Sequence, residues 1–231
     1  MTKYLIMTKS IYILSGGKSS RMGTDKGMLL YRGTKLIDLK IDLVQVLGMV
    51  PKVLANSPLY DDLSLEIIKD IYKEKGPLGG LHSALSNTND EWVVLLPIDE
   101  LNVNKDIYEN LFSSLDSDFD AIYYKDLTGD QYLIGAYHKR IKNQVEERLN
   151  NNQLSMRELV KNIHCKTLTI EKDHIFQNLN SPEELGKNLV EVRFFGMLEE
   201  EMKRNKAHVL IGETEREDLK AFILKNFPNL E

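Results

Sequence analysis

A loop rich in glycine and cations follows the first apolar stretch of the chain and carries its clearest chemistry. Residues 11–14 predict a buried strand, and Gly16 and Gly17 directly after it widen the range of backbone angles that the chain can adopt. Main-chain N–H groups of such a loop can turn inward around an anion. Hydroxyl and cationic side chains follow at Lys18, Ser19, Ser20, Arg21 and Lys26. The loop indicates a phosphate site, although the glycines alone also fit an ordinary turn with solvated cations.

Spacing excludes two better-known phosphate loops. The full Walker arrangement that ends in Gly-Lys-Ser/Thr is absent, and so is the Gly-x-Gly-x-x-Gly of dinucleotide folds. The sequence also has no Ser-His-Asp grouping that spacing supports, no His-x-x-x-His pair and no Cys-x-x-Cys. A transfer to an already ionised phosphate fits this lack of an evident general base, because such a reaction needs positioning and charge neutralisation.

Polar groups follow three further predicted strands. The strands cover residues 52–55, 65–69 and 92–96, and the polar groups are Asn56, Asp70 and Asp99. A glycine-rich segment, 76–80, predicts a flexible loop before a helix over 81–86. Ligands bind beyond the carboxyl ends of the strands in such sheets, so these groups are expected to gather at one edge. Asp99 suffices there to hold Mg²⁺ with a nucleoside triphosphate, although an isolated Asp is also a common turn residue or cap.

The order of predicted elements gives the fold class. Strands alternate with helices in the first half, where a helix over 36–47 follows a short β-excursion over 28–36. The second half is mixed, with predicted helices over 105–115, 141–149 and 156–162 and strands over 121–124, 133–137 and 165–170. Ser155 is a good N-cap, and Ser181 begins a capping box. The sequence therefore predicts an α/β fold with a doubly wound, mostly parallel, Rossmann-like sheet.

Composition narrows the class of protein. The chain has 231 residues, 42% hydrophobic and 28% charged, and a mean hydropathy of −0.32, values typical of a soluble globular protein. A net charge of −5 argues against a general nucleic-acid binder. No apolar run approaches a membrane span, and the N-terminus lacks the features of a secretory signal. The single cysteine, Cys165, fits a reducing compartment, so we expect a cytoplasmic protein without nucleic-acid or membrane partners.

An ordered set of motifs resembles the molybdenum cofactor guanylyltransferase family. The motifs are residues 14–26 (LSGGKSSRMGTDK), Ala55-Asn56, Asp70, residues 76–81 (GPLGGL), Pro97-Ile98-Asp99, Ser155-Met156-Arg157 and residues 178–183 (NLNSPE). Enzymes of this family join GMP from GTP to molybdopterin and release pyrophosphate. The resemblance covers roughly residues 11–185. The ordered set of motifs is far more specific than any one of them, since the first motif alone fits the broader nucleotidyltransferase group.

The resemblance implies a role for each matching residue. Residues expected to line the nucleotide are Leu14, Ser15, Gly16, Gly17 and Gly80. Lys26, with Arg21, would neutralise the triphosphate and the charge that develops during transfer. Asn56 and Asp70 would contact the nucleoside, with the carboxylate accepting from guanine, while Asp99 would hold Mg²⁺ and Asn180 would border the pterin. The departures from the family pattern, at Ser15, Ile98 and Leu101, bear on efficiency and substrate choice.

Several alternatives remain open at the level of sequence. A related enzyme could transfer CMP or use a sugar phosphate, and Asp70 discriminates because a guanine-reading carboxylate favours GTP. A non-catalytic nucleotide-binding scaffold in cofactor delivery is the alternative outside enzymes. Besides GTP and molybdopterin, the resemblance brings in molybdoenzymes and cofactor-delivery proteins as partners.

The pattern changes in the tail. We expect a nucleotidyltransferase domain over 1–188 and a partial β-grasp-like tail over 189–231, with strands at 190–196 and 208–211 and helices at 198–204 and 214–227. The tail resembles the first half of the sulfur-carrier subunit of molybdopterin synthase. That carrier works through a C-terminal Gly-Gly, whereas this chain ends in residues 228–231 (PNLE). We therefore expect a structural appendage, whose apolar surface packs on the main domain or on a second chain.

Overall fold

The structure is a computed structural model that describes residues 7–15, 25–31, 34–170, 176, 187–193, 195 and 206–212. The predictions for Gly16, Gly17, Arg21 and Asn180 lie outside the described residues, as do those for the capping box at Ser181 and for the tail helices. The chain divides into two compact units, one of residues 1–17 and 40–177 and the other of residues 18–39 and 178–231. The domain boundary expected after residue 188 divides the chain at one point, whereas each of these units contains two separate segments. That boundary stays a prediction.

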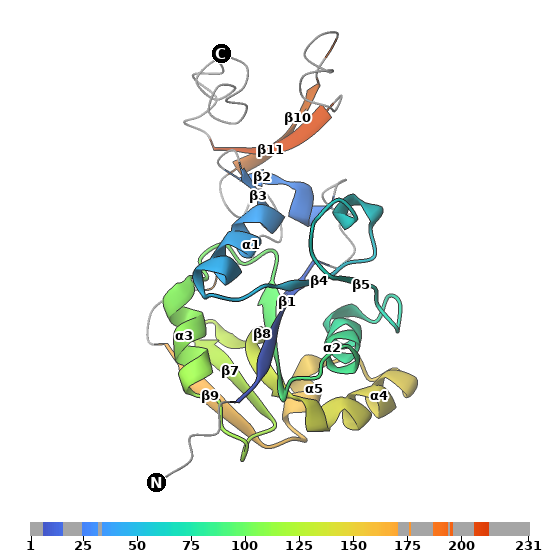
Figure 1. Cartoon of the computed structure of the whole chain (residues 1–231), viewed down its shortest axis with the longest axis vertical. Coiled ribbons are helices and arrows are strands. Elements are labelled where there is room, and N and C mark those ends of the chain that lie inside the picture. The colour runs from blue at the N-terminus through green and yellow to red at the C-terminus, as the bar shows by residue number, and fades with distance from the viewer. Residues whose placement is uncertain are drawn as a thin grey trace. The chain divides into compact units, whose positions relative to one another are not determined.

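A seven-stranded sheet forms the core of the first unit (Figure 1). Its strands, in spatial order, are β5 (Ile67–Ile68), β4 (Lys52–Leu54), β1 (Lys9–Leu14), β6 (Trp92–Pro97), β8 (Gly129–His138), β7 (Ala121–Asp126) and β9 (Cys165–Thr169). The pairs β5–β4, β4–β1, β1–β6 and β7–β9 are parallel, and only the pairs that β8 makes are antiparallel. This topology confirms the predicted mostly parallel sheet.

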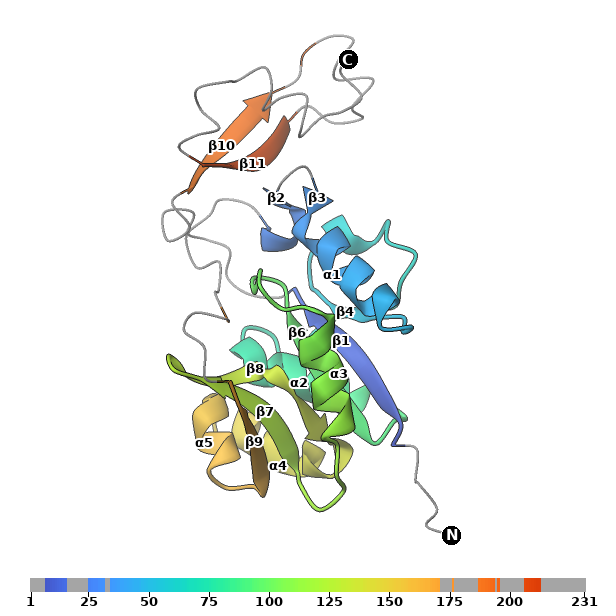
Figure 2. The same cartoon turned by 90° about the vertical axis from the view of Figure 1, so that its left-hand side faces the viewer.

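Helices cover both faces of this sheet. The helices α2 (Gly76–Ser86), α4 (Lys142–Asn150) and α5 (Met156–Val160) lie on one side, and α3 (Lys105–Ser113) lies on the other (Figures 1 and 2). Apolar side chains of α2, α4 and α5 share one buried cluster with Val93 and Leu95 of β6. Because side chains alternate along a strand, the neighbouring residues of β6 face the other layer, and all of β6 is buried. The sheet is therefore doubly wound, as predicted.

Hydrogen bonds of two tyrosine hydroxyls connect α3 to its face of the sheet. Tyr108 on the helix donates to the main-chain oxygen of Leu95 at 2.9 Å. Tyr124 on β7 donates to the main-chain oxygen of Ile107 at 2.8 Å and accepts from the Asn110 amide at 2.9 Å. Asn104 caps the helix, because its side chain accepts from Ile107 N–H. These bonds satisfy polar groups that burial would otherwise make costly.

Helix α1 (Leu36–Val46) matches the predicted helix but presents an unexpected buried stripe. Its fully buried residues are Leu36, Ile37, Lys40 and Val44. The leucines at 39, 43 and 47, which suggested the helix in the sequence, are only partly buried. A lysine on the buried stripe therefore needs a specific partner.

The predicted loop over 76–80 is wrong, because α2 begins at Gly76 and runs to Ser86. Pro77 lies in the first turn, where its missing N–H would have no intrahelical partner. A Cβ on Gly79 would lie 2.9 Å from the main-chain oxygen of Tyr72, so this glycine permits close packing of the helix. Gly79 and Gly80 thus permit close packing of the helix, whereas Gly76, with a φ of +62° and nothing within 4 Å of a Cβ, supplies a backbone conformation that favours glycine. The start of α5 is confirmed, since Ser155 Oγ accepts from Glu158 N–H at 3.3 Å.

A second, four-stranded sheet lies in the second unit. Its order is β10 (Lys187–Arg193), β11 (Lys206–Gly212), β2 (Leu30–Tyr31) and β3 (Thr34–Lys35). The predicted excursion after the phosphate loop is thus a short hairpin, β2–β3. Strand β11 of the tail runs parallel to β2, with Val209 opposite Leu30. The tail strand thus pairs with a strand of its own unit, and packing of the tail on the main domain or on a second chain stays a prediction.

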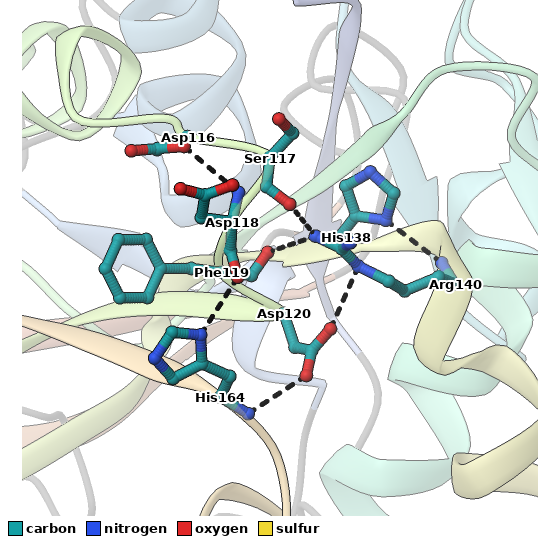
Figure 3. A network of polar contacts seen from close by, with 8 residues as sticks. All are labelled: Asp116, Ser117, Asp118, Phe119, Asp120, His138, Arg140 and His164. Carbon is teal, nitrogen blue, oxygen red and sulfur yellow. Dashed lines mark hydrogen bonds and ion pairs between the residues drawn. The ribbon is translucent and has the colours of Figure 1, made fainter.

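A polar cluster closes the edge of the main sheet where β7 and β9 begin and β8 ends (Figure 3). The Asp120 carboxylate pairs with Arg140 Nε at 2.9 Å and accepts from His164 N–H at 2.9 Å. Arg140 also donates to the main-chain oxygens of Ser117 and Phe119. Since β6 runs parallel to β7, this cluster lies at the opposite edge from Asp99 and serves to hold the strand ends together.

Among the described residues, no helix has both the length and the apolar character that a membrane crossing requires.

Candidate active site

The carboxyl ends of β5, β4, β1 and β6 meet at one edge of the main sheet. The Ser15 N–H donates to the main-chain oxygen of Leu54 at 3.0 Å, which joins the ends of β1 and β4. The Ile98 N–H donates to the main-chain oxygen of Leu14 at 3.1 Å, which joins the ends of β6 and β1. The structure therefore brings Leu14, Ser15, Asn56, Asp70 and Asp99 to the same edge, as predicted.

Asn56 and Asp70 form a mutual pair at this edge. The Asn56 amide donates to the Asp70 carboxylate at 2.7 Å, and the Asp70 N–H donates to Asn56 Oδ1 at 3.0 Å. Asn56 is exposed and Asp70 is partly exposed, so both remain accessible to a ligand. Two bonds in opposite directions fix the orientation of the carboxylate, which lies on a segment that follows a strand of only two residues.

Ser15 turns its hydroxyl into the protein. Its Oγ is hydrogen-bonded to the hydroxyl of Tyr60, and the residue is 8% exposed. Tyr60 is fully buried in a short 3-10 helix, Pro58–Tyr60, that Ser57 caps. Sequence reasoning missed Tyr60, because nothing in the local pattern shows that this loop returns to the end of β1. The hydroxyl and the N–H of Ser15 are therefore both bonded within the protein, and a contact of Ser15 with a nucleotide stays a prediction.

Gly80 lies against the end of β1. A Cβ on Gly80 would be 3.0 Å from Leu14 Cδ2, which is tighter than ordinary contact. The structure thus brings these two predicted nucleotide-binding residues together and gives the glycine a packing reason. A contact of either residue with a nucleotide stays a prediction.

Asp99 is part of a short turn after β6 that a buried lysine holds. Lys40 is 4% exposed, and its Nζ donates to the main-chain oxygen of Glu100. Burial lowers the pKa of Lys40 to about 8, while the Glu100 and Asp99 carboxylates act to raise it. Glu100 is fully buried, and its Oε1 accepts from Asn102 N–H at 3.2 Å. Sequence reasoning missed both, although Lys40 lies one helical repeat from Leu36 and from Val44 on the buried stripe.

Magnesium at this edge stays a prediction, for which Asp99 offers a carboxylate. Among the described residues, no group of three or more His, Cys, Asp or Glu side chains could hold a metal ion. Mg²⁺ needs only one or two carboxylates when phosphate oxygens and water complete its octahedral shell. Asp99, which is partly exposed beside the strand ends, has the chemistry that such a site requires.

Lys26 belongs to the second unit. It opens a short 3-10 helix, Lys26–Met28, and Asp25 caps this helix by accepting from Gly27 N–H at 3.0 Å. The side chain of Lys26 is partly exposed. Since the other described site residues lie in the first unit, an approach of Lys26 to Asp99 stays a prediction.

An aromatic pair on β7 and β8 lies toward the same edge. The rings of Tyr123 and Tyr132 are 5.2 Å apart, and the Tyr132 hydroxyl donates to the Asp130 carboxylate at 3.0 Å. Burial and this bond raise the pKa of Tyr132 to about 12. Sequence reasoning did not single out these residues, because aromatic residues in strands are common in any core.

Comparisons with known proteins place this geometry in a family. A probable molybdenum cofactor guanylyltransferase of Flavobacterium johnsoniae is 31% identical over 78% of this chain and 95% of its own length. A molybdenum cofactor guanylyltransferase of Vibrio parahaemolyticus is 30% identical over 81% of this chain and 94% of its own length.

The fold is also that of solved structures. A molybdopterin-guanine dinucleotide biosynthesis protein A from Archaeoglobus fulgidus matches with a TM-score of 0.67 at 22% identity, covering 77% of this chain and 94% of that one. A CMP:2-keto-3-deoxy-manno-octonic acid synthetase, solved in complex with CTP, matches with a TM-score of 0.61 at 12% identity. The match covers 77% of this chain and 95% of that one. The model of the MobA-like NTP transferase domain matches residues 11–167. The chain therefore belongs to the MobA-like NTP transferase family.

Proposed function

We propose that this protein is a molybdenum cofactor guanylyltransferase, which transfers GMP from GTP to molybdopterin and releases pyrophosphate. The names of relatives that are about 30% identical over nearly their whole length support this assignment. The observation that carries it is the pair of carboxylates, Asp70 and Asp99, at the ends of β5 and β6 on one edge of the sheet. One carboxylate suits a base and the other suits a metal-bound triphosphate.

Asp70 selects guanine in this proposal. The N1–H and N2–H donors of guanine point to one side of the base, and a carboxylate accepts from both, whereas cytosine and adenine lack this pair of donors. Asn56 supports the choice because it holds the Asp70 carboxylate from one side. The fold alone does not choose the base, since a structure solved with CTP shares it.

The chemistry is a displacement at phosphorus. An oxygen of the terminal phosphate of molybdopterin forms a bond to the α-phosphorus of GTP, and the bond from this phosphorus to the oxygen that bridges to the β-phosphate breaks. The attacking phosphate is ionised at neutral pH, so the step needs no general base. Asp99 would hold Mg²⁺, which supplies charge neutralisation for the triphosphate. Lys26 and Arg21 would add positive charge, and the main chain from Leu14 to Gly17 and at Gly80 would line the nucleotide.

The cellular setting is part of the proposal. A cytoplasmic location fits the single cysteine, and molybdoenzymes or cofactor-delivery proteins are the partners that would receive the product. Asn180 would border the pterin.

Calorimetry with GTP, CTP and ATP in the presence of Mg²⁺ tests the proposal first. We expect selective GTP binding that weakens in Asp99→Ala, followed by pyrophosphate release only when molybdopterin is added. Preference for CTP would indicate instead a related nucleotidyltransferase that transfers CMP. Tight GTP binding without turnover on molybdopterin would favour a scaffold in cofactor delivery.

A further inference from the structure

A buried cation lies beneath the turn that carries Asp99. Lys40 on α1 is 4% exposed, and a lysine with so little exposure needs a partner for its charge. Its Nζ donates to the main-chain oxygen of Glu100, the residue directly after Asp99. The bond therefore connects a helix to the backbone of the turn, and it acts on the segment that orients the Asp99 side chain.

Glu100 gives this cation a second role. The Glu100 carboxylate is fully buried, and it lies close enough to influence both Lys40 and the buried hydroxyl of Tyr108. Its Oε1 also accepts from Asn102 N–H, which shapes the next step of the chain. Lys40 thus compensates a buried negative charge in addition to holding the backbone. The two roles can be separated, because one depends on the Glu100 side chain and the other on its main chain.

We propose that Lys40 is a positioning residue for the metal-binding carboxylate, and that its hydrogen bond to the Glu100 main chain sets the orientation of Asp99. The inference rests on the proposed function, in which Asp99 holds the metal of the metal–GTP complex. Other bonds already hold the turn from the strand side, since Ile98 N–H is bonded to the main-chain oxygen of Leu14. Lys40 holds it on the far side of Asp99, so the two bonds flank the carboxylate in the sequence.

Three variants separate positioning from charge compensation. Lys40→Met removes the charge and the donor but keeps an unbranched side chain in the core, and it leaves the Glu100 carboxylate buried without this cation. The double variant Lys40→Met/Glu100→Gln removes both charges and keeps an acceptor for Asn102 N–H. Lys52→Met is the control, because Lys52 is a partly buried lysine that pairs with Glu66 at 3.1 Å but lies at the start of β4, away from the site edge.

Two readouts are needed. Thermal unfolding reports stability, and electron paramagnetic resonance of Mn²⁺ with GTP reports metal affinity without requiring turnover. We expect Lys40→Met to unfold at a lower temperature and to bind Mn²⁺ about tenfold more weakly, as is typical when a group that orients a metal ligand is lost. The double variant should recover stability but keep the weak Mn²⁺ binding. Lys52→Met should bind Mn²⁺ like the wild type.

The outcomes are distinct. Recovery of both stability and Mn²⁺ affinity in the double variant would overturn the inference, because charge compensation alone would then explain Lys40. Unchanged Mn²⁺ affinity in Lys40→Met would also overturn it, while leaving the proposed function intact. A wild type that binds GTP but no Mn²⁺ would overturn the metal role of Asp99 itself, and the inference with it. If Lys40→Met does not fold, the charge-balanced double variant carries the test.

Discussion

A carboxylate can select a base only if its orientation is fixed before the base arrives. Asn56 fixes Asp70 through two hydrogen bonds, one to the side chain and one from the main chain. The pair is built from residues that follow different strands, so its geometry depends on the register of β4 with β5. Base selection is therefore a property of two side chains that the sheet edge brings together.

Asp70→Asn should remove the preference for GTP. The amide would present a donor where guanine also donates, so discrimination against CTP and ATP should fall by about 1–3 kcal/mol. Calorimetry with the three nucleotides measures this change. Asp61→Asn, on the exposed turn that follows Tyr60, is the control and should keep the preference. Retained selectivity in Asp70→Asn would show that another group reads the base.

Lys26→Ala should slow the transfer step. Loss of one preorganised charge at a reacting phosphate typically lowers kcat by about 10²–10³. Single-turnover rates at saturating GTP and Mg²⁺ measure the effect without interference from product release. Lys35→Ala removes a cation from β3 of the same unit and should leave the rate unchanged. Equal rates in Lys26→Ala and the wild type would remove Lys26 from the catalytic groups.

Sequence reasoning predicts which polar residues gather at this edge and misses the residues that hold them in place. Asn56, Asp70 and Asp99 could be predicted because each follows an apolar strand, and the ends of parallel strands share an edge. Tyr60, Lys40 and Glu100 could not, because their roles depend on side chains that are distant in the chain and meet only in the folded sheet. The one local signal, a lysine in phase with a buried stripe, became decisive only once the face of α1 was known.

Helix α2 is where the elements differ most from their predicted form. Its glycines suggested a flexible loop, yet they lie in the first turns of a helix, where Gly79 packs closely on the Tyr72 backbone and Gly80 on Leu14, while only Gly76 has a positive φ. A sequence shows where a glycine stands. It does not show whether the fold needs that glycine for its backbone freedom or for its lack of a side chain. Packing on a neighbouring element decides between the two.

The contact between α2 and α4 should weaken in acid. His82 is 2% exposed, stands edge-on to Tyr72 and lies 4.0 Å from the Glu146 carboxylate. Burial lowers its pKa below 6.5, Lys142 acts in the same direction, and Glu146 opposes them. The neutral imidazole is therefore the stable form in the fold. Its contribution is fully present above pH 6.5 and is lost as the pH falls through the lowered pKa.

Urea unfolding between pH 8 and pH 5 measures this contribution. The free energy of unfolding of the wild type should decrease as the pH is lowered. The decrease should be less steep in His82→Phe, which keeps a ring against Tyr72. His164→Phe, at an exposed histidine, is the control and should keep the steeper dependence. Identical slopes in His82→Phe and the wild type would exclude His82 as the source.

Gly135 allows a close approach between β8 and β7. A Cβ there would lie 2.8 Å from the main-chain oxygen of Ile122 and 2.9 Å from Tyr123 Cβ, next to an irregularity in the register of the two strands. Gly135→Ala should therefore destabilise the protein by about 1–3 kcal/mol, because backbone atoms must shift to admit the methyl group. Chemical denaturation measures this loss, and an unchanged midpoint would show that the strands separate without cost.

At the scale of the molecule, the two sheets differ in how they are built from the chain. Every strand of the seven-stranded sheet lies between Lys9 and Thr169, whereas the smaller sheet joins β2 and β3 to β10 and β11 of the tail. The curated relatives cover about four-fifths of this chain and nearly all of their own length. The family model matches residues 11–167, the part of the chain that holds nearly all of the larger sheet.

A chain shortened to residues 1–177 should keep the larger sheet and lose protection in the smaller one. All strands of the larger sheet remain, while β2 keeps β3 but loses β11, its neighbour on the other side. Hydrogen exchange measures this directly, and we expect faster exchange at the amides of β2 and unchanged exchange in β1 and β6. Loss of protection throughout β1 and β6 would show that the tail stabilises the whole molecule.

The parallel pairing of β11 with β2 also has a consequence for the order of folding. Val209 follows Leu30 by 179 residues, whereas the last strand of the larger sheet ends at Thr169 and so leaves the ribosome earlier. The short hairpin after the phosphate loop must therefore wait for its neighbour while the rest of the nucleotidyltransferase domain is already able to fold. During that interval β2 presents an open strand edge, which closes only when β11 has been made and can pair with it.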